Sequence, residues 1–136
     1  MVVCDLAFTH PEAKLGYPEV DLGVCPAVVA PLLIRRIGAG RARSMLLMGG
    51  TMSGSDGFET GLATHLVPRE ELDESVDRHV ENLIKGGPEA IRATKKWLNE
   101  IESPELAESI KRGAEISEEI IRGEEAQERL KRLFSS

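Results

Sequence analysis

The sequence predicts an α/β chain with little strand and much helix, the helices being concentrated toward the C-terminus. Short apolar runs in the N-terminal half are typical of buried strands. Beyond residue 68, apolar residues recur at steps of three and four, which is the spacing of a helix with one apolar face. The 136 residues, 41% of them hydrophobic, are enough for one domain with a sizeable core.

The N-terminal elements are expected to be short. Residues 2–8 are predicted to form a buried strand. Residues 9–12 fit a capping box, with Thr and Glu at the required spacing, so a single helical turn is expected to follow and to end at Gly16. Residues 17–20 are predicted to form a second short strand, in which Pro18 favours an edge or an end position.

Proline and glycine mark the helices of the middle of the chain. Within the apolar run 27–37, Pro31 indicates either a helix start near Ala30 or a kink, and Gly38 marks the end of the helix. A second helix is predicted over residues 41–48 and a third, capped by Ser53, over residues 54–60. A short strand is expected at 62–67.

Three further helical regions follow, each opened by a proline. The prolines are Pro68, Pro88 and Pro104, the last preceded by Ser103 as a cap. The first of these helices carries one apolar stripe, made of Leu72, Val76, Val80, Leu83 and Ile84. The last is rich in charged residues, typical of a solvated helix face, and Gly113 and Gly123 are expected to mark bends in it.

Charge and composition narrow the possible partners. The net charge of −6 argues against a nucleic-acid surface and against an anionic membrane surface. No segment approaches the ~18 apolar residues of a membrane span, and the N-terminus lacks the basic region of a signal peptide. Cys4 and Cys25 have no metal-like spacing, so free thiols in a cytoplasmic compartment are expected. Because the chain opens on an apolar run, we expect upstream sequence or another chain to supply its neighbours.

The most informative stretch is Leu15-Gly-Tyr-Pro-Glu-Val-Asp-Leu-Gly-Val-Cys-Pro26. It places the carboxylate of Glu19 directly after a proline and among small and apolar residues. General acid or base catalysis uses carboxyl groups in such apolar settings. A turn with a solvated glutamate at its edge has the same spacing, so the pattern alone leaves both interpretations open.

The sequence of several stretches resembles that of the crotonase family, which comprises the enoyl-CoA hydratases and isomerases. The matching stretches are 4–7, 15–20, 22–26, 34–38 (IRRIG), 46–50 (LLMGG), 61–68 (GLATHLVP) and 87–95 (GPEAIRATK). The resemblance implies the C-terminal part of a spiral of ββα turns over residues 1–67, followed by a helical C-terminal region over 68–136. The apolar run 26–31 resembles the branch of methylglutaconyl-CoA-type hydratases and of the hydratase-like enzymes of polyketide β-branching.

The resemblance also implies a chemistry and a partner. The family acts on acyl-CoA thioesters, so the implied activity is reversible hydration of a 2-enoyl-CoA, a reaction of fatty acid metabolism. Glu19 matches one of two catalytic glutamates and would exchange a proton with the substrate. Tyr17, Pro18, Leu22 and Gly23 would line the pocket beside it. No metal or separate cofactor is implied, because coenzyme A is part of the substrate.

The stretches that match the family leave out part of its catalytic machinery. Both oxyanion donors, the second glutamate and the main CoA-binding loop match positions upstream of Met1. Removing a single oxyanion donor costs roughly a hundredfold or more in rate, so the isolated chain is expected to be inactive or weakly active. The expected partner is a further copy, as in the family's trimers and hexamers, or an N-terminal half. A non-catalytic oligomerisation or interaction module and an enoyl-CoA isomerase remain as alternatives.

The other candidate residues carry little signal. His10, His65 and His79 share neither metal nor triad spacing, and surface or turn roles are expected for them. Arg92, Lys95 and Lys96 could meet a CoA phosphate, but solvated helix charges account for them better.

Overall fold

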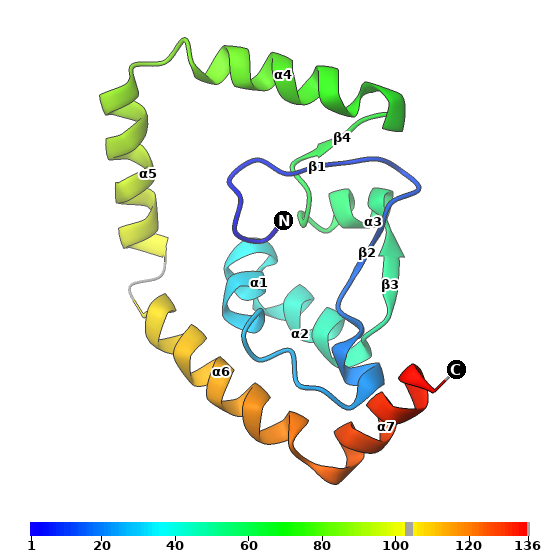
Figure 1. The fold of residues 1–136 in the computed structure, drawn as a ribbon. Helices are drawn as coiled ribbons and strands as arrows, with labels where there is room; N and C mark the ends of the chain where they lie inside the picture. The colour runs from blue at the N-terminus through cyan, green and yellow to red at the C-terminus, as the bar shows by residue number, and fades with distance from the viewer. Residues whose placement is uncertain (103–104, 136) are drawn as a thin grey trace.

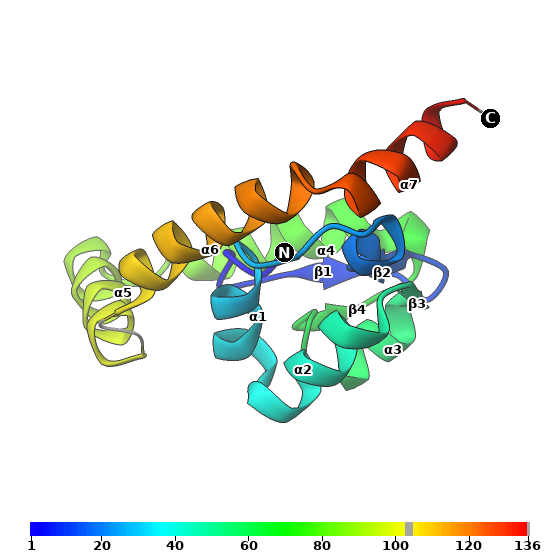
Figure 2. The ribbon, with the colours of Figure 1, turned by 90° about the horizontal axis from the view of Figure 1, so that it is seen from below.

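A small core is framed by a chain of four helices. The computed structural model describes residues 1–102 and 105–135. The N-terminal half forms the core, and helices α4 to α7 follow one another around its edge (Figure 1). Seen from below, α6 and α7 run almost in line along one side, with α1 and α2 on the other (Figure 2).

The strands of the described residues form two short pairs. Strand β1 (Phe8–Thr9) pairs in parallel with β4 (His65–Leu66). Strand β2 (Lys14–Gly16) pairs antiparallel with β3 (Thr51–Ser53), so that Leu15 lies opposite Met52. These pairs join residues between positions 8 and 16 to residues 35 to 57 positions later.

The sequence-based prediction for residues 2–16 is wrong in two places. The strand expected over 2–8 forms only at its end, in β1, and Val3 is 65% exposed because no described strand covers it. The helical turn expected before Gly16 does not form, because pairing with β3 draws residues 14–16 into strand β2. Strand β3 is only three residues long and is not predicted from the sequence.

The segment predicted as a second strand is a short helix. Residues Pro18–Leu22 form the 3-10 helix η1, with Pro18 in its first turn. Proline suits that position, because its fixed φ matches a helix and its missing N–H would have no intrahelical partner there.

The core lies between helices α1 (Ala30–Ile37) and α2 (Ala39–Met48). Its buried apolar residues are Leu33, Ile37, Ala42, Met45, Leu46 and Leu62. The start of α1 at Ala30 confirms the prediction from Pro31. Helix α3 (Gly54–Glu59) has the predicted Ser53 cap, completed by Asp56 as a capping box. Only two residues of the strand expected at 62–67 pair, as β4.

The helical region begins with the short 3-10 helix η2 (Arg69–Glu71) and then α4 (Leu72–Leu83). The remaining helices are α5 (Pro88–Glu102), α6 (Leu106–Ile121) and α7 (Glu124–Phe134). The predicted break at Gly123 is confirmed, whereas Gly113 lies inside an unbroken α6. The start predicted at Ser103 and Pro104 lies outside the described residues, and the division at residues 67 and 68 stays a prediction.

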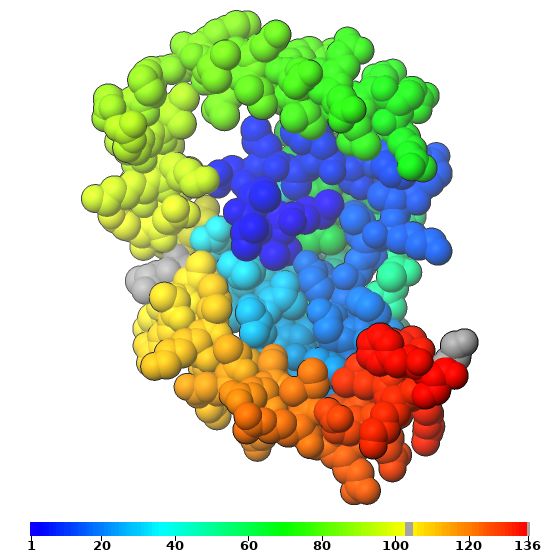
Figure 3. Space-filling model, viewed as in Figure 1, coloured from blue at the N-terminus to red at the C-terminus, as the bar shows by residue number. Residues whose placement is uncertain are grey.

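The predicted apolar stripe of α4 is present but poorly covered. Ile84 is 73% exposed, and Trp97 on α5 is 60% exposed. The space-filling view shows an opening between these helices and the N-terminal residues (Figure 3). Over the part of the chain that is described, none of the helices combines the length and the apolar character needed to cross a membrane.

Candidate active site

Helix η1 holds Glu19 on a turn with defined ends. Gly23 closes the helix in the left-handed conformation, with φ of 71°. The N–H of Val24 donates to the carbonyl of Glu19 at 2.9 Å, and that of Gly23 donates to Val20 at 3.1 Å. These bonds fix the backbone from which the Glu19 side chain projects.

Glu19 lines a largely apolar cavity of about 410 Å³. The other lining residues are Cys25, Pro26, Val28, Val29, Leu32 and Ser117. Oε2 of Glu19 is buried and has no hydrogen-bond partner among the described residues. A buried carboxylate oxygen without a partner is unfavourable, and a ligand that donates a hydrogen bond would satisfy it.

Tyr17 lies close enough to Glu19 to sense its charge. Burial raises the pKa of the Tyr17 phenol, and the negative charge of Glu19 raises it further. The ring packs against the core cluster around Leu33. Tyr17 therefore packs against the core and lies near the Glu19 carboxylate.

A larger cavity of about 890 Å³ adjoins the first. It lies between α1 and α6, and its walls include Ala30, Ile34 and Ile116. Cys25 lines both cavities, so the two spaces meet at this residue. Its thiol is free, as expected from the sequence, and so is that of the exposed Cys4.

The four residues predicted to line the pocket lie around η1 rather than in this cavity. Pro18 is exposed, whereas Tyr17, Leu22 and Gly23 are half-buried, and none of the four is among the residues that line the cavity with Glu19. Gly23 faces α7, since a Cβ on it would lie 2.9 Å from Cδ of Arg129. Their role in substrate binding stays a prediction.

The sequence reasoning missed Ser117. This residue belongs to α6, and its hydroxyl donates to the carbonyl of Cys25 at 3.0 Å across 92 positions of sequence. It is the polar residue that α6 contributes to the Glu19 cavity. A serine on a charged helix carries no local signal of such a contact.

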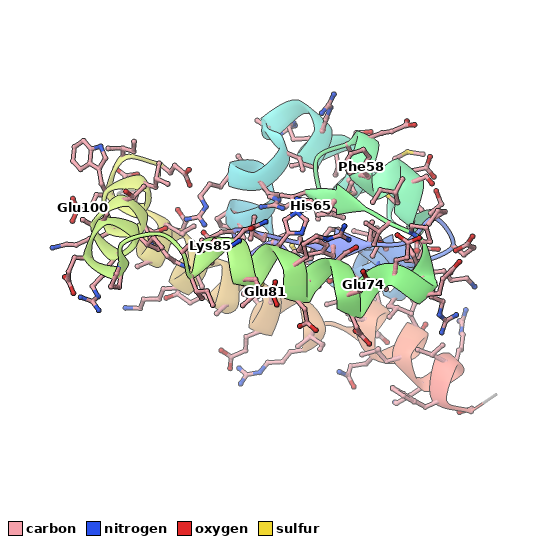
Figure 4. All side chains as sticks on the ribbon, turned by 90° about the horizontal axis from the view of Figure 1, so that it is seen from above. Phe58, His65, Glu74, Glu81, Lys85 and Glu100 are labelled. Carbon is pink, nitrogen blue, oxygen red and sulfur yellow. The ribbon has the colours of Figure 1, made fainter. Side chains whose placement is uncertain are left out.

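Two of the three histidines are not in simple surface or turn positions. The ring centroids of His65 and His79 are 4.4 Å apart, and Phe8 stacks on His65 at 4.3 Å. Burial lowers the pKa of His65, and the charge of His79 lowers it further. Figure 4 shows His65 close to α4, whose Glu74 and Glu81 point away from the core. Packing between elements distant in sequence explains why the expectation for His65 and His79 is wrong.

The candidate metal ligands and phosphate-binding cations have the following positions. Within residues 1–102 and 105–135, no three His, Cys, Asp or Glu side chains are placed to hold a metal ion. Lys95 forms an ion pair with Asp5 at 2.6 Å, Arg92 pairs with Glu89, and Lys96 pairs with Glu100 at 3.9 Å. Arg92 and Lys96 thus pair within α5, whereas Lys95 links α5 to the N-terminal segment across 90 positions of sequence.

Comparison with known proteins identifies the family. The model of the enoyl-CoA hydratase/isomerase family matches residues 1–134. The chain belongs to the enoyl-CoA hydratase/isomerase family. A crotonyl-CoA hydratase of Syntrophomonas wolfei is 32% identical over 98 residues, which are 71% of this chain and 38% of that enzyme. A short-chain-enoyl-CoA hydratase of Clostridioides difficile is 27% identical over 98 residues, which are 71% of this chain and 63% of that enzyme.

Solved structures of the family share the fold. The enoyl-CoA hydratase of Bacillus halodurans superposes with a TM-score of 0.86 at 26% identity, over 96% of this chain and 53% of that one. An enoyl-CoA hydratase of Mycobacterium avium subsp. paratuberculosis gives a TM-score of 0.91 at 21% identity, over 98% and 56% of the two chains. This member of the enoyl-CoA hydratase/isomerase family thus has part of the crotonase fold and spans about half the length of these structures. Its branch within the family stays a prediction.

Proposed function

We propose that this chain takes part in the reversible hydration of a 2-enoyl-CoA, with Glu19 as a general acid and base. The observation that carries the proposal is the buried, unpartnered Oε2 of Glu19 in an apolar cavity. Family membership and the hydratase names of its relatives support the same reaction.

Hydration takes one proton from water and delivers one proton to the substrate. Water adds its oxygen to the β-carbon of the enoyl thioester and releases a proton, while the carbon–carbon π bond breaks and the α-carbon receives a proton. A protonated Glu19 donates the proton to the α-carbon, the carboxylate that remains takes up the proton released by water, and the reverse reaction runs both transfers backward. Val28, Val29 and Leu32 supply apolar walls beside the carboxyl group.

The thioester oxygen also has to be stabilised as it becomes an enolate. Preorganised N–H donors supply this stabilisation in acyl-transfer and enolate chemistry. Among the side chains lining the cavity, Ser117 already donates its hydroxyl hydrogen to Cys25. We therefore propose that further polypeptide completes the site, as the family's longer chains do, and that this chain alone is inactive or weakly active.

Hydration of crotonyl-CoA tests the proposal. Loss of the ultraviolet absorbance of the conjugated thioester measures turnover by this chain alone and by this chain mixed with the N-terminal half of the Bacillus halodurans hydratase. We expect weak or no turnover alone, a gain on mixing, and loss of that gain with Glu19→Gln, which keeps the shape and removes the acid and base. Full turnover by the chain alone would refute the need for a second segment. Unchanged turnover with Glu19→Gln would refute the role of Glu19.

A second candidate function is oligomerisation without catalysis. The observation that favours it is the exposed apolar surface of α4 and α5, which includes Val80, Leu83, Ile84, Trp97 and Ile101. Exposed apolar patches of this kind mark interaction surfaces. Light scattering of the wild type and of Ile84→Lys tests it, since a stable oligomer that Ile84→Lys dissociates, without acyl-CoA binding by calorimetry, would favour this function. For the isomerase alternative, conversion of a 3-enoyl-CoA followed by NMR gives the distinguishing product.

A further inference from the structure

The segment that follows Glu19 lies along helices α6 and α7. Arg129 donates from Nη1 to the carbonyl of Asp21 at 3.2 Å, and Ser117 donates to that of Cys25 at 3.0 Å. Gly113 faces Ala27 so closely that a Cβ on this glycine would lie 2.4 Å from the Ala27 carbonyl oxygen. Arg129 also approaches Gly23. The C-terminal helices therefore contact residues 21, 23, 25 and 27 of this segment.

Helix η1 is held from two sides. It has five residues, none of them fully buried, and Val20 and Asp21 lie against Gly49 at the end of α2. One anchor is the carboxylate of Asp21, whose Oδ2 accepts from the N–H of Gly50 at 2.8 Å in the turn between α2 and β3. The other is Arg129, which approaches from α7 on the same residue.

The contact of Arg129 suits the end of a short helix. The last carbonyls of a helix have no intrahelical partner and carry partial negative charge, so a cation that donates to them is stabilising. Arg129 is itself oriented, because its Nε donates to Glu125 on the preceding turn at 3.1 Å. Its aliphatic stem lies against Gly23, where a side chain would collide with it.

We propose that Arg129 is a positioning residue that acts through the backbone of Asp21 to keep Glu19 aimed into its cavity. Helix α7 is then part of the catalytic site, although none of its side chains lines that cavity. The inference rests on the proposed function for the role of Glu19, but the contact and its test do not require turnover.

Tyr17 supplies the readout, because it is the single tyrosine of the chain. Its pKa is raised by burial and by the charge of Glu19, so its titration reports where that carboxylate lies. The measurement is the difference absorbance of the phenolate across the alkaline range, on the full chain, with circular dichroism at each pH to follow the fold. Glu19→Gln is expected to lower the pKa of Tyr17, since the negative charge is removed.

Arg129→Ala is expected to shift the titration in the same direction, because the freed turn lets the carboxylate move away from Tyr17. Loss of the arginine charge by itself would raise the pKa of a nearby phenol, so a fall reports displacement of Glu19. Combining Arg129→Ala with Glu19→Gln is expected to shift the pKa of Tyr17 no further than Glu19→Gln alone does. Arg129→Lys keeps a charge and a donor, so the pKa of Tyr17 in this variant is expected to lie between those of Arg129→Ala and the wild type. Arg122→Ala is the matched control, since Arg122 pairs with the exposed Glu118 near the same junction of helices.

Three results would overturn the proposal. In the first, the pKa of Tyr17 in Arg129→Ala equals that of the wild type. In the second, the pKa shifts caused by Arg129→Ala and Glu19→Gln add in the double variant. In the third, Arg122→Ala shifts the pKa of Tyr17 as much as Arg129→Ala does. Hydration is measured separately. If Arg129→Ala shifts the titration as expected and no mixture hydrates crotonyl-CoA, the proposed function fails while the positioning contact is retained.

Discussion

Replacing Gly113 with alanine is expected to destabilise the chain, although alanine is the better helix former. Gly113 is buried inside α6, where that helix crosses the segment after Glu19. The added Cβ would lie 2.4 Å from the carbonyl oxygen of Ala27, 2.8 Å from its carbonyl carbon and 3.1 Å from Cα of Val28. All three are backbone atoms, so no side-chain rotation relieves the contact and α6 has to move outward.

The size of the effect follows from opposing contributions. Alanine in a helix interior is favoured over glycine by about 1 kcal/mol. Overpacking of a close contact costs about 1–3 kcal/mol, and outward movement of α6 also breaks the bond from Ser117 to Cys25, which is worth about 1 kcal/mol. The free energy of unfolding is therefore expected to fall by about 1–3 kcal/mol.

Urea denaturation followed by circular dichroism measures this change, and Gly40→Ala is its control. Gly40 lies in α2, and a Cβ there would meet nothing within 4 Å. Because Gly40 lies in the first turn of α2, this substitution is expected to raise the free energy of unfolding by up to about 0.5 kcal/mol. If Gly113→Ala stabilises the chain as Gly40→Ala does, α6 does not approach Ala27 closely and the described wall of the two cavities is incorrect.

Three further predictions concern the core, a helix cap and a histidine. Leu33→Ala removes a side chain with 0% exposure and is expected to cost about 2–5 kcal/mol in urea denaturation; a cost below that of a surface Leu47→Ala would contradict the described core. Ser53→Ala removes the cap of α3 and is expected to cost about 1 kcal/mol, with Ser53→Thr, which keeps the hydroxyl that bonds to Asp56, as the variant that should retain most of the stability. Because the pKa of His65 is lowered from 6.5, the unfolded chain binds the proton first, so stability is complete above that pH and is lost as pH falls through the window below it. His65→Phe is expected to reduce the slope of unfolding free energy against pH in that window, and an unchanged slope would show that another group is responsible.

Helices could be predicted from the sequence because their signals are local. Pro88 at the start of α5, Pro31 in the first turn of α1 and the Ser53 cap of α3 each mark a boundary within a few residues of sequence. Strands depend on partners elsewhere in the chain. Strand β1 includes only the two residues that pair with β4. Residues Lys14–Gly16 form β2 because β3 pairs with them. Neither pairing has a signal within the segment itself.

The candidate site divides in the same way. Glu19 could be found because its neighbours in sequence carry the resemblance to the family. Ser117 and Arg129 could not, because each is one polar residue among many on a solvated helix. Their contacts with the Glu19 segment span 92 and 108 positions of sequence, and only the folded chain brings them together.

The periodicity of apolar residues in the helical region shows which face of each helix is apolar. It does not show which other element packs against that face. In α6, Ile116 lines the cavity beside α1, whereas in α4 and α5 residues of the same pattern, Ile84 and Trp97, remain exposed. The two halves of the helical region thus have different relations to the site: α6 and α7 contact the Glu19 segment directly, while the apolar surface of α4 and α5 supplies none of the residues that line the Glu19 cavity. If a partner covers α4 and α5, it buries apolar surface that supplies none of that lining, so a substitution such as Ile84→Lys is expected to change self-association and to leave the Glu19 cavity intact.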